Sequence, residues 1–164
     1  MTSNNNWRGS EDAILKTYNP NSGYADLEAP LQFYHWGAYG PDKKTFDGVD
    51  IRAEVLMLSS NVKVTSEDSG DGWGCAIVTS DFRESNGVWR EGETFMDNVE
   101  VYNCSQYDTF RAALRFDGAK TKKSEVTNSA FHHGLGKGFQ IYNSKNIKLK
   151  NNVFYDFIQF GGNI

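Results

Sequence analysis

Two adjacent histidines, His132 and His133, are the residues of this chain whose side chains could most directly do chemistry. Histidine transfers protons near neutral pH, and the glycine-rich segment 134–138 that follows leaves the backbone open to a ligand. In an alternating strand only one of two neighbouring side chains can point inward. The structural alternative, which we favour, makes one histidine a core or turn residue and the other a solvated neighbour.

A second group, Asp50, Arg52 and Glu54, combines both signs of charge at a spacing of two residues. On a strand these side chains would share one face and form one charged row. Hydrolysis of a polysaccharide needs a carboxylic acid and a carboxylate, whereas lyase chemistry on an acidic sugar needs a base and a cation. The same row could equally be a salt-bridge ladder on a solvated face, so the sequence leaves both interpretations open.

Metal and thiol chemistry find little support in the sequence. The acidic turn at Glu67, Asp68 and Asp71 could attract calcium, but its spacing matches no EF-hand, so we expect a solvated loop and no cofactor. Cys75 and Cys104 form neither a CxxC motif nor a metal-ligand spacing. The two cysteines could pair or remain free thiols.

Bulk properties narrow the class of protein. A formal net charge of -4 and a single short cationic cluster, Lys120, Lys122 and Lys123, disfavour a nucleic-acid partner. No apolar run reaches the length needed to span a membrane, so we expect no membrane contact by this segment. Aromatic residues at 14% and 16 glycines indicate short strands joined by many polar turns.

A repeat indicates the elements that would position these groups. Segments 99–105, 124–130 and 147–153 each alternate apolar and polar residues and run into an asparagine. Asn103, Asn128 and Asn151 therefore recur after 25 and 23 residues, about one coil of a parallel β-helix. Asparagine tolerates the left-handed conformation at which such coils turn, and we predict that the three side chains form a stacked ladder.

Further copies extend the repeat. Segments 113–118, 139–144 and 157–162 form the second half of each unit, and 61–64 with 76–80 form an earlier copy if a loop near 81–95 is inserted. The repeat predicts an all-β fold, a right-handed parallel β-helix with four coils over 48–164. Residues 1–47, with apolar stretches on both sides of a turn at 19–23, are predicted to be an antiparallel β lead-in or cap. A β-sandwich is the alternative fold.

Four motifs stand out across the chain: Ala29-Pro30-Leu31 followed by His35-Trp36-Gly37, the run Asp50-Ile51-Arg52-Ala53-Glu54-Val55, Ala113-Leu114-Arg115-Phe116, and Phe131-His132-His133-Gly134. Together they resemble the fibrocystin-like and cell-surface hyaluronidase family. The resemblance implies an eight-glycine domain leading into a right-handed parallel β-helix, in large extracellular or ciliary surface proteins, some of which bind or cut hyaluronan. It covers nearly the whole chain, which would then be a fragment of the β-helix region.

On that resemblance we expect a structural or adhesive segment of an extracellular or ciliary cell-surface protein, with glycans or neighbouring copies of itself as partners. The alternative is a hyaluronidase-type enzyme that uses the charged row or the histidine pair. A secretory location would also make Asn103-Cys104-Ser105 an N-glycosylation sequon. Because Asn103 falls on the repeat, we favour a buried ladder position, from which an inward side chain could not carry a glycan.

Overall fold

The computed structural model describes residues 9–35, 45–46, 49–50, 52–67 and 71–164. Every named element in these ranges is a β-strand, so the expected all-β class is confirmed. The chain divides into two compact units, residues 1–56 and 57–164, which we describe separately.

The N-terminal unit contains two antiparallel pairs, β1 (Leu15–Asn19) with β2 (Tyr24–Leu27) and β3 (Thr45–Phe46) with β4 (Val49–Asp50). The turn between β1 and β2 lies where the sequence places it, but β2 begins earlier than the apolar stretch at 29–33. Residues 48–56, expected to belong to the coils, are part of this unit.

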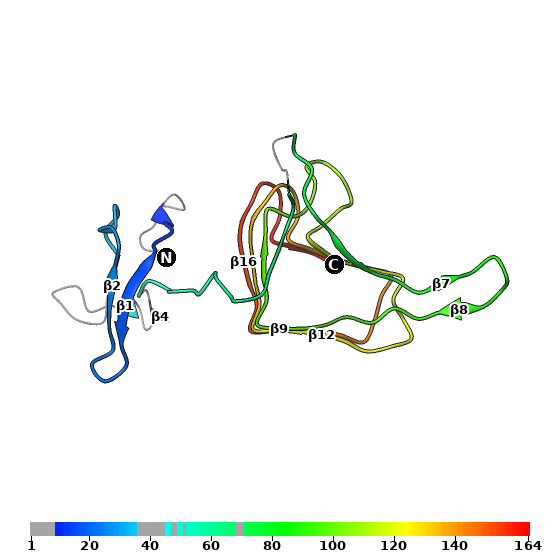
Figure 1. Ribbon diagram of the computed structural model, residues 1–164, viewed down its shortest axis with the longest axis horizontal. Helices are drawn as coiled ribbons and strands as arrows, with labels where there is room; N and C mark the ends of the chain where they lie inside the picture. Colours follow the sequence, from blue (N-terminus) through cyan, green and yellow to red (C-terminus); the bar gives the residue numbers. More distant parts are fainter. Residues whose placement is uncertain (1–8, 36–44, 47–48, 51, 68–70) are drawn as a thin grey trace. The chain divides into compact units, whose positions relative to one another are not determined.

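The C-terminal unit is built from three parallel sheets, which Figure 1 shows as the sides of a triangle. The first sheet contains β5 (Lys63–Thr65), β10 (Glu100–Tyr102), β13 (Ala130–Gly134) and β16 (Val153–Phe157). The second contains β6 (Ile77–Thr79), β11 (Leu114–Asp117), β14 (Phe139–Tyr142) and β17 (Gly162–Asn163). The third contains β9 (Phe95–Asp97), β12 (Ser124–Thr127) and β15 (Ile147–Lys150).

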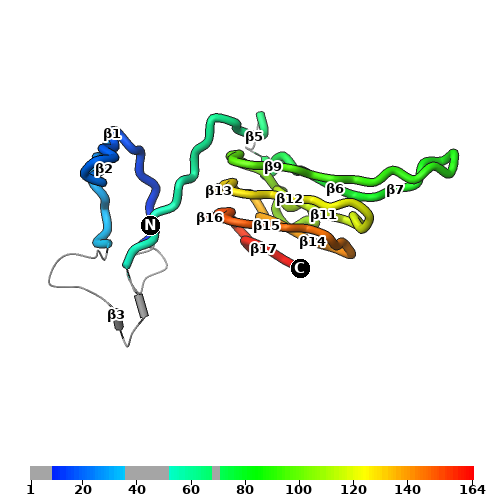
Figure 2. Tube along the Cα trace, turned by 90° about the horizontal axis from the view of Figure 1, so that it is seen from below, coloured from blue at the N-terminus to red at the C-terminus, as the bar shows by residue number. Residues whose placement is uncertain are grey.

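The chain visits the three sheets in a fixed order. It runs from the third sheet to the first and then the second in β9–β10–β11, and repeats this order in β12–β13–β14 and β15–β16–β17. We call each such round through the three sheets a pass. The strands β5 and β6 form an earlier, partial pass, because β5 pairs with β10 and β6 pairs with β11. Figure 2 shows the successive passes lying one above another.

Apolar side chains of stacked strands fill the space between the sheets. In the first sheet Val101 pairs in register with Phe131, which pairs with Phe154, and the rings of these two phenylalanines stack with centroids 4.8 Å apart. Leu114 and Phe116 of the second sheet and Val126 of the third are fully buried in the same cluster. Burial of apolar area is the main favourable term for such a core, at about 25 cal/mol per Å².

Residues in the left-handed conformation mark the corners between sheets. Asn98, Asn128 and Asn151, with φ of 55°, 51° and 55°, occupy the same position between the third and first sheets. Asn103 instead turns the chain after the first sheet, in register with His133 and Asp156. The predicted ladder is therefore wrong in one member, because Asn98 and not Asn103 stacks below Asn128.

The inserted segment that the sequence places near 81–95 contains a hairpin. Strands β7 (Phe82–Arg83) and β8 (Trp89–Arg90) pair antiparallel and project away from the sheets in Figure 1. The carboxylate of Asp81 accepts hydrogen bonds from the amides of Gly92, Lys120 and Thr121 and from the Thr121 hydroxyl. These bonds connect the base of the hairpin to the next pass. The amide of Lys120 and the hydroxyl of Thr121 are the main reasons why the pKa of Asp81 is lowered to about 2.

We predict that Asp81→Asn lowers the melting temperature at neutral pH, because the amide accepts these bonds less well than a carboxylate does. The folded pKa lies below the ordinary value of 3.8, so the stabilisation is present above about pH 4 and is lost as the pH falls towards 2. Thermal melts of both proteins between pH 7 and pH 2 should therefore converge at the acidic end. The exposed Glu91→Gln in the same insertion is the charge-matched control, and an equal effect in that variant would contradict the prediction.

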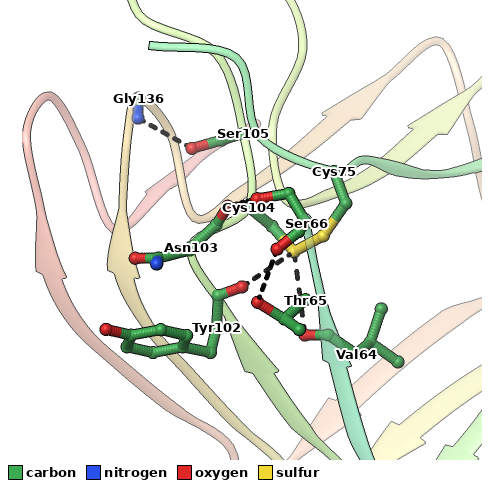
Figure 3. Close-up of a disulfide and its surroundings, with 9 residues drawn as sticks. All are labelled: Val64, Thr65, Ser66, Cys75, Tyr102, Asn103, Cys104, Ser105 and Gly136. Carbon is green, nitrogen blue, oxygen red and sulfur yellow. Dashed lines mark hydrogen bonds between the residues drawn. A yellow bond between two sulfur atoms is a disulfide. The ribbon is translucent and has the colours of Figure 1, made fainter. Parts of the chain in front are cut away.

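A disulfide between Cys75 and Cys104 joins the first two passes, as Figure 3 shows. The two residues form a parallel bridge across the corner that follows the first sheet, and Cys104 is almost fully buried. The structure thus decides between the two states that the sequence left open. The bond closes a loop with a sequence separation of 29 residues.

We predict that the Cys75→Ser, Cys104→Ser double variant loses about 3 to 4 kcal/mol of unfolding free energy, because closing a loop of this length removes entropy from the unfolded chain. Urea unfolding with and without a reductant measures this difference. The wild-type midpoint should fall in reductant while that of the double variant stays unchanged. A wild-type midpoint that ignores the reductant would contradict the prediction.

Candidate functional site

The outer face of the first sheet carries the best-defined cluster of ionisable side chains in the described residues. Because side chains alternate along a strand, Val101 and Phe131 point into the core and their neighbours Glu100, Tyr102 and His132 point outward. Glu100 and His132 are nevertheless only 5% and 6% exposed. These two ionisable side chains thus lie on the outer face of the sheet, but neighbouring side chains shield them from solvent.

Glu100 is the centre of the cluster. Its Oε1 lies 2.7 Å from Nζ of Lys63 and 3.3 Å from Nε2 of His132, and its Oε2 accepts the amide hydrogen of Ser60 at 3.2 Å. Burial raises the pKa of Glu100, but the Lys63 hydrogen bond and the Ser60 amide together outweigh it, so the pKa lies below its ordinary value. The carboxylate is therefore ionised at neutral pH.

The two histidines contact each other through their Nδ1 atoms, which are 2.7 Å apart. One Nδ1 must donate and the other accept, so at most one of the rings carries a proton on both nitrogens while this bond is intact. Burial lowers the pKa of His132, and His133 beside it lowers the pKa further, despite the opposing effect of Glu100. On the far side, Nε2 of His133 lies 3.7 Å from Oδ2 of Asp156.

His133 meets His132 because of its backbone. With φ of 50° it occupies the left-handed corner, which breaks the strand alternation and turns both rings towards the outside. Tyr102 and Tyr155 flank the pair, with ring centroids 5.5 Å and 5.9 Å from that of His133. His133 is thus a corner residue, and the rings of both histidines lie on the outer face beside Tyr102.

The cluster extends from Lys63 through Glu100 and the histidines to Asp156. Such a chain of groups can either pass protons along or hold an ionised side chain in a fixed position. Glycoside hydrolysis needs a protonated carboxylic acid, whose pKa is raised. Glu100 has the opposite character, because Lys63 and an amide hold it ionised. The arrangement therefore matches a structural network better than a pair of catalytic carboxylates.

The charged row lies in the other unit. Arg52 and Glu54 are exposed and belong to the segment that follows β4, and the side chain of Asp50 lies outside the described residues. Since β4 ends at Asp50, the three residues do not share one continuous strand. The structure thus assigns the row and the histidine pair to separate units, and both remain predictions as catalytic groups.

The acidic turn is described in part. Glu67 and Asp71 are exposed, and Asp68 lies outside the described residues. No group of three or more His, Cys, Asp or Glu side chains suited to a metal ion occurs in the part of the chain that the structure describes. The same part contains no helix long and apolar enough to cross a membrane.

A second surface, which we call the aromatic platform, comprises Trp73, Phe110, Arg111 and Lys137. The guanidinium of Arg111 lies 5.4 Å from the centroid of the Trp73 ring, and Nζ of Lys137 lies 5.3 Å from that of Phe110. Trp73 and Phe110 remain 52% and 69% exposed. Lys137 also donates to the carbonyl of Thr109 at 3.1 Å, which fixes it against the loop that carries Phe110.

Most residues of both surfaces were not predicted from the sequence. Glu100, Lys63 and Tyr102 join the histidines because β10 pairs with both β5 and β13. The available signal was the 30-residue offset between Glu100 and Ala130, which the repeat based on asparagines did not use. Nothing in the spacing of Trp73 and Arg111 along the sequence indicated their contact.

Comparison with known proteins identifies one similarity. The chain is 24% identical to human Fibrocystin-L over 143 residues, which cover 79% of this chain and 3% of that protein. The chain thus spans only a small part of the relative that it matches. No family model and no solved structure matches the chain.

We predict that His132 titrates below its ordinary value of 6.5, because burial and His133 disfavour its charged form. The unfolded chain then takes up this proton first, so stability declines as the pH falls below about 6.5. NMR titration of the imidazole signals, assigned with His132→Asn, measures the pKa.

The variant Glu100→Gln provides the internal comparison. Glu100 raises the pKa of His132, so its removal should move the titration of His132 to a still lower pH. A His132 that titrates above 6.5 in the wild type, or a rise in the Glu100→Gln variant, would contradict this description of the cluster.

Proposed function

We propose that residues 57–164 form a segment of a right-handed parallel β-helix that acts as a structural or adhesive element in an extracellular or ciliary cell-surface protein. The observation that carries the proposal is the fixed order of the passes, which places each strand beside its counterpart in the next pass. A stack of this kind has long flat faces and strand edges that can be extended by further passes.

Two observations support the location. The similarity to Fibrocystin-L favours a fibrocystin-like relationship and, through it, a cell-surface protein. The disulfide between Cys75 and Cys104 favours an oxidising compartment, because cytosolic thiols are kept reduced.

The aromatic platform is the surface that we propose for adhesion to glycans. Aromatic rings stack against the apolar faces of sugar rings, while Arg111 and Lys137 can pair with acidic groups of the glycan. Both cations are already held beside a ring, so little side-chain freedom remains to be lost on binding. Neighbouring copies of the chain are the other partner class, through the edges of β15, β16 and β17 that no described strand covers.

We predict that Trp73→Ala weakens binding to acidic glycans on a glycan array about tenfold, which corresponds to about 1.4 kcal/mol. Trp89→Ala is the matched control, because Trp89 is 64% exposed on the projecting hairpin and lies outside the platform. Unchanged binding in Trp73→Ala, or an equal loss in both variants, would contradict the assignment of adhesion to the platform.

Negative-stain imaging and a hyaluronan-depolymerisation assay on the same material test the wider proposal. Regular fibres would support association between copies of the chain through their open strand edges. Glycan binding without cleavage would support an adhesive role. Cleavage of hyaluronan that is lost in His132→Ala, His133→Ala or Arg52→Ala would instead make the chain an enzyme.

A further inference from the structure

Asn103 differs from the asparagines with which the repeat first grouped it. It begins the sequence Asn103-Cys104-Ser105, an N-glycosylation sequon, and it lies at the corner after the first sheet. Its φ of 53° places it in the left-handed region, like Asn128 and Asn151, but in another column of the stack. The ladder argument against a glycan at this position therefore no longer applies.

The side-chain amides of Asn128 and Asn151, two members of the stacked column, are both hydrogen-bonded. Nδ2 of Asn128 donates to Asp97 at 2.8 Å, and Nδ2 of Asn151 donates to Asn128 at 3.2 Å. Asn103 makes no such side-chain hydrogen bond within the described residues, and its backbone carbonyl accepts one from the Ser66 hydroxyl. Figure 3 shows its amide on the opposite side of the backbone from the disulfide, and the residue is half-buried.

We propose that Asn103 carries an N-linked glycan, an inference that rests on the proposed entry of the chain into the secretory pathway. The donor is a lipid-linked oligosaccharide diphosphate. The amide nitrogen Nδ2 forms a bond to C1 of the first sugar while the bond from C1 to the diphosphate oxygen breaks. One amide proton goes to a base of the transferase, and the lipid diphosphate leaves.

The rest of the sequon determines when this transfer takes place. Ser105 is fully buried, and its hydroxyl accepts the amide hydrogen of Gly136 at 2.7 Å. Cys104 is almost fully buried and bonded to Cys75. A transferase needs access to all three residues, so the glycan is added before this corner folds and before the disulfide closes.

The glycan then projects from the corner column that Asn103 shares with His133 and Asp156. The chain can still close its core afterwards, because the amide of Asn103 faces away from the disulfide. The modification thus occupies the outer side of this corner without displacing Ser105 or Cys104.

The test uses the whole chain behind a secretion signal in a eukaryotic cell, with Lys145→Thr as an internal reference. This substitution completes a second sequon that begins at Asn143, an exposed residue that is also left-handed, with φ of 46°. Release of the glycans by an amidase converts each modified asparagine to aspartate, and peptide mass spectrometry locates it. Asn103→Asp in the same background is the matched control, because aspartate also tolerates the left-handed conformation.

Two glycans per chain, at Asn103 and Asn143, with one remaining in the Asn103→Asp variant, are the expected result. A single glycan at Asn143 alone overturns the inference. Since the reference site shows that the chain has met the transferase, that outcome would concern Asn103 itself and would leave the proposed surface role untouched.

Discussion

In-register pairing between successive passes is the constraint on which the rest of the C-terminal unit depends. Each strand must lie beside its counterpart, so each corner must turn the chain at the same place in every pass. Only a residue that accepts positive φ can do so within so short a corner, and asparagine, aspartate, histidine and glycine occupy these positions. The apolar columns, such as Val101 on Phe131, follow from the same register. Packing and backbone conformation thus depend on one geometrical requirement.

The charged cluster of the first sheet is a product of this register as well. Glu100, Lys63 and His132 are distant in sequence and meet because three passes present them on one outer face. A related contact occurs on the third sheet, where Lys148 lies 2.5 Å from Glu125 of the preceding pass. That pair is partly exposed and therefore contributes little to the free energy of unfolding. The buried Glu100, in contrast, stays ionised only because its partners stabilise its charge.

The sequence predicted that the strands repeat, but it predicted two segments per unit where the structure has three strands per pass. Apolar alternation identified β10, β11, β12, β14 and β15 and the earlier copy in β5 and β6, but it did not separate β13 and β16 as strands. Asn103 and Asn128 were aligned because both follow an alternating stretch, yet they end strands of different sheets. Two corners of one pass can share the same local chemistry, and only the pairing of the sheets distinguishes them. The contact of His132 with His133 was not predicted for a similar reason, since it depends on the left-handed backbone conformation of His133 at the corner.

The disulfide has a mechanical consequence. If the ends of the unit are pulled apart, each later pass is held mainly by the pass beneath it, so the stack can lengthen by releasing one pass at a time. The segment between Cys75 and Cys104 cannot contribute to this lengthening, because a covalent bond closes it. About 100 Å of extended chain is thereby withheld from the extension. Under load the two ends of the unit would thus respond differently. The disulfide-closed loop near its start would not extend, whereas the passes near its end would unfold one at a time.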